Sequence, residues 1–334
     1  MKFAVSVFGN QPMPRIIERV RMIESLGFDA VWFGDLQRIC REVYVEMTAC
    51  ALNTSRITLG VGVTMPTTRH ASVTASTFAS LHEIAPGRIR AGISTGDSGV
   101  RSIGRRPESI ARLESYIRQV KGLLQGEIVE FDEGGKAKLA WLQAPTNIPV
   151  YVAATGPRLT RAAGRMADGA ILLRERDPAQ MAVGVRMFKE AAGEAGKAPG
   201  ETKISCWLQT CLGADRMLAR RKLNGPVGVI INMSNPALFD REDLPLISKL
   251  KENYNPSKHS RSYVSDEFRI PDKYIDRFAL GGDRDDAISC IEQLSRVEGL
   301  DEIILAPQHI PEVPGPSVDE TIRYFAEEVL PRVA

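Results

Sequence analysis

The sequence has no large excess of one charge and no long apolar run. Its 334 residues carry 43 lysines and arginines against 41 aspartates and glutamates, which leaves a net charge of +2. So small an excess cannot follow a phosphate backbone, and nucleic acid is not an expected partner. No segment reaches the roughly 18 apolar residues of a membrane span, and the apolar run 3–5 is too short for a signal peptide. We therefore expect a soluble, cytoplasmic protein.

Cysteine and histidine are few, and they are not spaced as metal ligands. These residues are Cys40, Cys50, Cys206, Cys211, Cys290, His70, His82, His259 and His309. The cysteine count is odd and no C-x-x-C spacing occurs, which argues against a disulfide framework and against a zinc site. The histidines form no H-x-H or H-E-x-x-H pattern, so no metal centre is predicted. A G-x-S-x-G nucleophile motif is missing too, as is a G-x-G-x-x-G motif after the first apolar run.

The sequence does contain a regular alternation of short apolar runs with longer amphipathic stretches. This alternation is typical of parallel strands joined by crossover helices. The eight runs predicted as strands are Lys2–Val7, Ala30–Phe33, Ile57–Thr64, Arg88–Ile93, Val150–Ala154, Ala170–Leu173, Lys203–Leu208 and Glu302–Ala306. Eight strands in strict alternation favour a closed (β/α)₈ barrel, a TIM-like fold of the α/β class, over an open sheet. Because such barrels reach this length as one domain, a single domain is expected over residues 1–334.

Two stretches are longer than a minimal barrel needs. Residues 127–141 contain Gly134-Gly135 between two alternating runs, which predicts a β-hairpin. Residues 224–273 are rich in proline, asparagine, serine and mixed charge, and they are long enough to form a helical lid. Three side chains of this second insertion could border a substrate pocket, although such residues in long loops more often serve packing. They are Tyr254, His259 and Tyr263.

The residues at or directly after the ends of four predicted strands are polar and rich in glycine. In chain order these segments are Gly34-Asp35, Gly62-Val63-Thr64, Ser94–Gly99 and Thr155-Gly156-Pro157-Arg158. The active sites of (β/α)₈ barrels lie where strands end and loops begin, so these segments should meet at one mouth of the barrel. We predict the functional site there.

The segment after the fifth strand suits a phosphate group. Gly156 lets backbone N–H groups approach an anion, Pro157 fits the first helical turn, and Arg158 supplies a positive charge. A plain turn with a helix cap is the alternative interpretation, because caps far outnumber phosphate sites.

The carboxylates at the predicted mouth also allow two interpretations each. Thr95, Gly96 and Asp97 can form hydrogen bonds to the polar edge of a heterocycle, and Asp97 can donate a proton. The alternative for this segment is a capped turn. Asp35 follows a buried strand, where it can either contact a ligand or cap the next helix.

Four sequence marks occur in the order expected of one known superfamily. They are Leu26–Asp35, Leu59–His70, Gly96-Asp97-Ser98, and Ala153–Arg158 with Ala167–Ala170. On these marks the sequence resembles the luciferase-like superfamily of flavin and deazaflavin oxidoreductases, nearly from end to end. Within that superfamily it is most similar to methylene-tetrahydromethanopterin reductases and their bacterial relatives.

The resemblance implies a TIM-like barrel with an insertion, commonly a homodimer, that binds a ring cofactor at the strand ends. That cofactor would be flavin mononucleotide (FMN) or the deazaflavin coenzyme F420, working in its reduced form. The resemblance further implies a non-prolyl cis peptide between Gly62 and Val63 that bulges against the ring. Two positions depart from the pattern, because Ser6 and Leu36 stand where the reductases have an acid and a histidine.

Carried over residue by residue, the resemblance implies three groups of cofactor contacts. Those on the ring are Asp35, Gly62, Val63 and Thr64. Those beside its reactive edge are Thr95, Gly96 and Asp97. Those at the phosphate are Thr155, Gly156, Pro157 and Arg158.

Three functions follow as hypotheses. The first is hydride transfer between coenzyme F420 and a small-molecule substrate, with Asp97 as the candidate catalytic proton donor. The second is a two-component monooxygenase, in which a separate flavin reductase supplies reduced FMN and oxygen is the oxidant. The third is a barrel that binds a flavin without turnover, because fold alone does not determine function.

Overall fold

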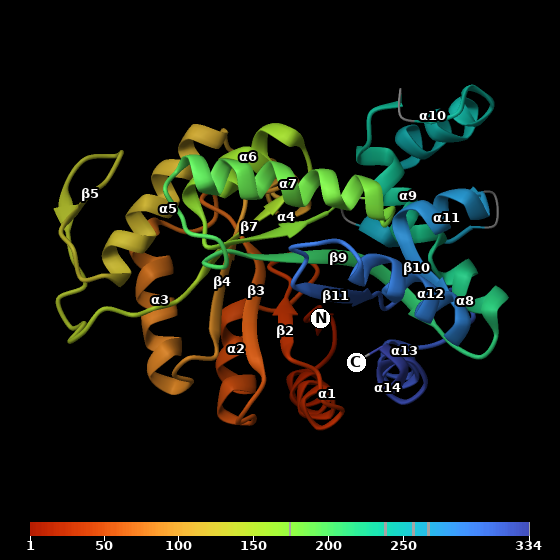
Figure 1. Cartoon of the computed structure of the whole chain (residues 1–334), viewed down its shortest axis with the longest axis horizontal. Coiled ribbons are helices and arrows are strands. Elements are labelled where there is room, and N and C mark those ends of the chain that lie inside the picture. Colours follow the sequence, from red (N-terminus) through yellow and green to blue (C-terminus); the bar gives the residue numbers. More distant parts are fainter. Residues whose placement is uncertain (174, 237–238, 256–257, 266–267, 334) are drawn as a thin grey trace. The chain divides into compact units, whose positions relative to one another are not determined.

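A computed structural model of the chain describes residues 1–173, 175–236, 239–255, 258–265 and 268–333, and it contains a closed barrel of eight parallel strands (Figure 1). The strands are β1 (Lys2–Val7), β2 (Ala30–Phe33), β3 (Thr58–Thr64), β4 (Ile89–Ile93), β7 (Val150–Ala154), β8 (Gly169–Leu172), β9 (Lys203–Leu212) and β11 (Glu302–Pro307). Their order is β9-β11-β1-β2-β3-β4-β7-β8, and β8 pairs with β9 to close the ring. This confirms the predicted TIM-like (β/α)₈ fold.

One strand is longer than predicted. β9 continues beyond Leu208 to Leu212, and its last four residues pair with β10 (Ala279–Gly282). The polar pair Gln209-Thr210 looks like a strand end in the sequence, but the Thr210 hydroxyl donates to the Leu208 carbonyl at 2.8 Å. Because that hydroxyl is satisfied inside the strand, burial of Thr210 costs little and the strand does not need to stop.

The chain forms two compact units. The first comprises residues 1–173, 182–206 and 298–304, and the second comprises the described parts of 174–181, 207–297 and 305–334. Strands β9 and β11 each contribute residues to both units. All four segments predicted to form the functional site belong to the first unit.

The helices of the first unit are α1 (Met13–Ser25), α2 (Val43–Leu52), α3 (Ala71–Ile84), α4 (Ser98–Arg101), α5 (Ile110–Leu124), α6 (Pro157–Met166) and most of α7 (Pro178–Glu194). Figure 1 shows α1, α2, α3 and α5 along the outside of the strands. In α1 the buried residues Ile16, Val20 and Ile23 recur at helical spacing and face the barrel. The helix ends before Gly27, whose φ of 91° favours glycine.

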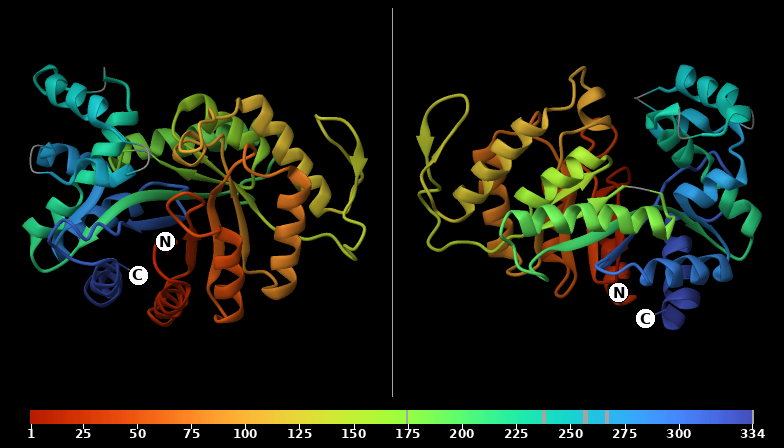
Figure 2. Two further views of the ribbon diagram at one scale, coloured as in Figure 1. Left: turned by 180° about the vertical axis from the view of Figure 1, so that it is seen from behind. Right: turned by 45° about the horizontal axis from the view of Figure 1, so that its top comes forward.

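A short antiparallel hairpin follows α5. Its strands are β5 (Val129–Glu130) and β6 (Lys136–Ala137), and Gly134 and Gly135 form the turn with positive φ angles. Both views of Figure 2 show the hairpin at the outer edge of the unit, beyond α5. Arg112 of α5 forms ion pairs with Asp132 and Glu133 at its turn.

The second unit contains α8 (Arg216–Lys222), α9 (Asn224–Met233), α10 (Leu244–Asn253), α11 (Asp272–Phe278), α12 (Arg284–Ser295), α13 (Val318–Tyr324) and α14 (Leu330–Val333). Short turns of 3₁₀ helix cover Arg241–Asp243 and His259–Tyr263, and a π turn covers Phe325–Val329. Tyr263 is 1% exposed within the core of this unit, and its hydroxyl donates to the Leu250 carbonyl. Tyr263 therefore serves packing, and partly buried Tyr254 packs against the same core. The side chain of His259 lies outside the part of the chain that the structure describes.

No helix among the described residues combines the length and the hydropathy that crossing a bilayer requires.

Candidate active site at the barrel mouth

Three glycines lie next to one another inside the barrel, where β2, β3 and β4 end. The strand register aligns Gly34, Gly62 and Gly92, each one residue beyond a paired position. Trp32 and Arg90, two residues earlier on their strands, both point into the barrel. Side chains alternate along a strand, so Gly34 and Gly92 face the interior as well, and Gly62 lies at the irregular end of β3. The space beside Gly34 is taken by the Phe8 ring, and the space beside Gly92 by Val61 and Val63.

A layer of large polar and aromatic side chains lies one step deeper in the barrel. The Glu302 carboxylate accepts hydrogen bonds from the Trp32 indole at 3.1 Å, from Arg90 at 2.8 Å and from Ser205 at 2.8 Å. The Arg90 guanidinium also lies over the rings of Trp32 and Tyr151. Because every charge in this layer is paired, it forms a rigid floor beneath the glycines.

Strand β3 bulges at its end, and Gly92 makes room for the bulge. The pairing of β3 with β4 shifts between Val61 and Thr64, and the Gly62–Val63 peptide bond is cis, as the resemblance implies. A Cβ atom on Gly92 would lie 2.1 Å from the Val61 carbonyl oxygen and 3.1 Å from a Val63 methyl group. Only glycine at position 92 therefore permits this approach of the two strands.

Asp35 lies beside the bulge in a network of hydrogen bonds. Its carboxylate is 4% exposed and accepts from Thr64 at 3.0 Å and from Arg69 at 2.5 Å. Burial raises the pKa of Asp35, although the Arg69 guanidinium acts in the opposite direction. Arg69 also pairs with Glu42, and it is Glu42 that caps α2. The capping interpretation of Asp35 is therefore wrong.

Replacing Arg69 with Ala should lower the free energy of unfolding by about 3–5 kcal/mol, because the buried Asp35 carboxylate would lose its partner. Chemical denaturation measures this change. Arg15, whose pair with Glu18 is exposed, offers the control, and Arg15→Ala should cost less than about 1 kcal/mol. Adding Asp35→Asn to Arg69→Ala should restore part of the loss. Equal effects of the two single arginine substitutions would show that the Asp35 network does not stabilise the mouth.

Asp97 lies at the rim of the mouth, directly after β4. Its side chain is 43% exposed, and its carboxylate accepts from Arg101 at 2.8 Å and from Ser98 at 3.3 Å. Asp97 precedes the short helix α4 but makes no capping hydrogen bond with its side chain. The capped-turn interpretation thus does not account for this carboxylate, which stays within reach of solvent and of small molecules.

The loop after β2 holds the Asp97 segment in place. Gln37 donates to the Gly99 carbonyl at 3.1 Å, and Arg38 donates to the Ser102 carbonyl at 2.8 Å. Gly96 has a φ of 89°, and a Cβ on it would meet Val100 and Met65 at about 3 Å. The loops after β2, β3 and β4 are therefore packed against one another.

The loop after β7 leads into α6 in the predicted way. The Ser94 hydroxyl at the end of β4 donates to the Ala153 carbonyl, which joins the two strand ends. Gly156 is the N-cap of α6, no side chain caps this helix, and a Cβ on Gly156 would meet nothing within 4 Å. The side chains around it are exposed, namely Thr155, Pro157 and Arg158. Uncapped N–H groups beside an exposed arginine can receive an anion.

Comparison with known proteins decides the family. The profile of the family described as luciferase-like monooxygenase matches residues 1–300, most of the chain. The chain belongs to this luciferase-like family. It is accordingly an enzyme of the oxidoreductase class, as the resemblance of its sequence marks implies.

Individual relatives cover the chain from end to end. A 5,10-methylenetetrahydromethanopterin reductase of Methanolobus tindarius is 27% identical over 339 residues, with 99% of this chain and 100% of the relative covered. The structure of the coenzyme F420-dependent tetrahydromethanopterin reductase from Methanopyrus kandleri has a TM-score of 0.83 at 24% identity, with 100% and 99% covered. An F420-dependent secondary alcohol dehydrogenase in complex with an F420-acetone adduct has a TM-score of 0.78 at 20% identity, with 100% and 99% covered.

Two glycines at the mouth of this luciferase-like barrel are closely packed, and a buried hydroxyl lies near them. A Cβ atom on Gly34 or Gly92 would clash with what lies there now, and Gly34 receives the ring of Phe8. In the layer below, the Ser6 hydroxyl is 1% exposed and has no hydrogen-bond partner among the described residues. A buried polar group without a partner is costly, and a bound polar molecule would supply the missing bond.

Several residues of this luciferase-like site cannot be found by reading the loops alone. Arg69 lies inside the sequence mark Leu59–His70, but its pairing with Asp35 has no local signature. Arg90 and Glu302 are 212 positions apart. The one sequence signal for this pair is that Arg90 lies within an apolar strand and Glu302 begins another, because a charged residue in a buried strand needs a partner.

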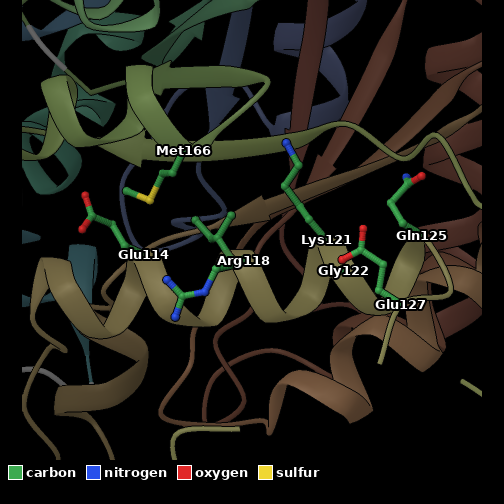
Figure 3. A pocket seen from close by; sticks show the side chains of 8 residues that line it. Glu114, Arg118, Lys121, Gly122, Gln125, Glu127 and Met166 are labelled. Carbon is green, nitrogen blue, oxygen red and sulfur yellow. The ribbon is translucent and has the colours of Figure 1, made fainter. Parts of the chain in front are cut away.

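An open pocket of about 410 Å³ lies elsewhere on the first unit (Figure 3). It is lined by Glu114, Ile117, Arg118, Lys121, Gly122, Gln125, Glu127 and Met166. Two of its charged groups already have partners, since Lys121 pairs with Asp168 and Glu114 pairs with Arg165. The lining comes from α5, α6 and the start of the hairpin, so this pocket is separate from the residues that follow the strands.

Proposed function

We propose that this protein transfers hydride between coenzyme F420 and a small-molecule substrate at the barrel mouth. The observation that carries the proposal is the bulge with the cis Gly62–Val63 peptide at the end of β3, beside the buried Asp35–Thr64 pair and with Asp97 at the rim of the mouth. Relatives whose names include coenzyme F420 or a reductase of a pterin substrate support this cofactor. When bound, the cofactor supplies the redox chemistry, and the protein positions it and keeps water out.

Each loop of the mouth has a role in this proposal. The bulge at Gly62–Val63 and Thr64 would support the face of the ring, and Asp35 would hold Thr64 and the ring-side edge. Thr95, Gly96 and Asp97 would lie beside the reactive edge, where Asp97 would donate or accept the proton that accompanies hydride transfer. Thr155, Gly156, Pro157 and Arg158 would bind the phosphate.

An oxygen electrode separates this proposal from its main alternative. The alternative is an FMN-dependent monooxygenase with a separate flavin reductase, and the family description, luciferase-like monooxygenase, favours it. Under the F420 proposal, the protein supplied with reduced FMN should consume oxygen no faster than the FMN control. It should instead oxidise or reduce coenzyme F420 with a member of a panel of alcohols, carbonyl compounds and pterins. Protein-dependent oxygen uptake without F420 turnover would establish the alternative.

Substituting Arg158 by Ala should weaken cofactor binding in a salt-dependent way. Arg158 is exposed beside the uncapped start of α6, so its attraction to a phosphate is screened by salt. We expect the affinity of the parent protein to fall between 50 mM and 500 mM NaCl, and that of Arg158→Ala to change less. Arg161→Ala, one helical turn further along α6, is the control. If Arg158→Ala binds the cofactor as the parent does at every salt concentration, the proposed phosphate site in this loop is wrong.

We also propose that the protein is a cytoplasmic homodimer. The five cysteines are free and buried, which suits a reducing compartment. The neighbouring helices α2 and α3 carry large apolar side chains that are exposed to solvent. The exposed fractions are 69% for Leu52, 58% for Val45, 53% for Val73 and 39% for Ile84. An apolar face of this kind typically marks a protein interface.

The double substitution Leu52→Asp/Val73→Asp should convert the dimer into a monomer. In a two-fold interface, each new carboxylate would be buried close to the same carboxylates of the second protomer. Sedimentation velocity measures the change. Ile128→Asp, directly before β5, is the control, since Ile128 is 70% exposed and belongs to neither α2 nor α3. A parent protein that sediments as a monomer at micromolar concentration would refute the dimer.

A further inference from the structure

Glu46 of α2 is a fully buried acid without a partner. Its side chain is 0% exposed, and neither carboxyl oxygen has a hydrogen-bond partner among the described residues. A carboxylate in that position would be an unpaired buried charge, which proteins avoid by keeping the group protonated. Burial accordingly raises the pKa of Glu46 to about 8.

The Glu46 carboxyl group touches the loop that follows β1. A Cβ atom on Gly9 would lie 1.5 Å from one of its oxygens, so the carboxyl fills the space that the glycine leaves. On its other side Gly9 is held by Arg41, whose backbone N–H and guanidinium both donate to the Gly9 carbonyl at 3.0 Å. Phe8, the residue before Gly9, covers Gly34 at the mouth.

Among the charged groups that act on Glu46 in the described part of the chain, Arg41 is the one that favours the ionised form. Arg41 lowers the pKa of Glu46, whereas Glu42 and Asp35 raise it. The charge of an ionised Glu46 also raises the pKa of two buried thiols, Cys40 in the loop after β2 and Cys50 on α2. An ionised Glu46 would therefore compete with the Gly9 carbonyl for the Arg41 guanidinium, because a charged acceptor binds it more strongly than a neutral one does.

We propose that Glu46 and Arg41 form a proton-controlled switch that positions the loop after β1 at the barrel mouth. While the Glu46 carboxyl is protonated, Arg41 holds the Gly9 carbonyl and the loop is closed. Loss of the proton to solvent turns the Arg41 guanidinium toward the carboxylate and leaves the Gly9 carbonyl with only the Arg41 backbone N–H, which loosens Gly9 together with Phe8 above Gly34. Glu46 and Arg41 are positioning residues in this scheme. The effect of this switch on catalysis rests on the proposed function. The movement of the loop after β1 does not depend on that function.

The sign of the pH dependence follows from the direction of the shift. The pKa of Glu46 is higher in the folded than in the unfolded chain, so this group contributes stability that is complete below the unfolded pKa. That contribution is lost as the pH rises to about 8. The melting temperature of the parent protein should therefore fall between pH 5 and pH 8 relative to that of Glu46→Gln, which carries no titrating group.

Hydrogen exchange in the protein without cofactor tests the switch directly. We expect the protection of residues 8–13 in the parent protein to fall about tenfold from pH 7 to pH 9, after correction for intrinsic rates, which matches the rise in ionised fraction of a group titrating near 8. Protection in Glu46→Gln should stay constant. Glu83→Gln, an exposed acid on α3, is the matched control and should behave like the parent.

Arg41→Gln keeps the test decisive if Glu46→Gln does not fold. It should show the lower protection of the same segment at both pH values, because the guanidinium bond to Gly9 is gone and only the backbone bond remains. Constant protection in the parent protein, or the same fall in Glu46→Gln as in the parent, would overturn the switch. A fall in the parent alone, in a protein that binds neither F420 nor FMN, would confirm the switch and refute the proposed function.

Discussion

Replacing Asp97 with Asn is expected to lower kcat by about 10²- to 10⁴-fold, the usual contribution of a positioned proton donor or acceptor. The amide oxygen can still accept from Arg101, so the loop should keep its shape while the group that exchanges a proton is lost. Cofactor affinity should therefore stay within about threefold of the parent value, a difference below 1 kcal/mol. Steady-state kinetics with F420 and fluorescence titration measure the two quantities.

Asp285→Asn is the matched control for this substitution. Asp285 is also an exposed carboxylate paired with a neighbouring arginine, Arg284, but it lies on α12 of the second unit. Its replacement should leave kcat unchanged. If Asp97→Asn retained full kcat, Asp97 would not move a proton in the rate-limiting step. If it lost cofactor binding instead, Asp97 would be a ring contact and not a proton donor.

Gly92→Ala should damage the site through the backbone. The new Cβ would lie 2.1 Å from the Val61 carbonyl oxygen, so β3 and its bulge at Gly62–Val63 must move. Overpacking of this kind costs about 1–3 kcal/mol of stability. Because the displaced bulge is the proposed support of the ring, we expect cofactor affinity to fall about tenfold or more. Denaturation and fluorescence titration report the two effects.

A glycine in open space provides the comparison for Gly92. Gly193 lies in α7, and a Cβ on it would meet nothing within 4 Å. Gly193→Ala should be neutral or stabilise the protein by about 0.5–1 kcal/mol, since alanine favours a helix over glycine. Loss of stability without loss of cofactor affinity in Gly92→Ala would place the cofactor away from the β3 bulge.

The barrel could be predicted from the sequence because parallel strands are buried on both faces. Lys2–Val7, Ala30–Phe33 and Val150–Ala154 were expected as strands and are strands with the same limits. Their apolar runs contrast with the amphipathic helices between them. Where a strand continues through polar residues, as β9 does beyond Leu208, the contrast disappears and the prediction stops early.

The site could be predicted only in part, because a sequence shows residues after strands but not what lies across a barrel. The segments after β2, β3 and β4 were expected to meet, and the contacts of Gln37 and Arg38 with the Asp97 segment join them. The role of Arg69 depends on the position of Asp35, which is 34 positions away. The unpartnered state of Glu46 depends on what surrounds α2, and neither feature leaves a local pattern.

The binding of coenzyme F420 and FMN to the purified protein, each oxidised and reduced and followed by fluorescence, tests the central claim most directly. We predict saturable binding of F420 at one site per chain, tighter than that of either form of FMN. Preference for reduced FMN would contradict hydride transfer through F420 and favour oxygen chemistry. Binding of neither cofactor would contradict the assignment of the glycine-lined mouth as a cofactor site.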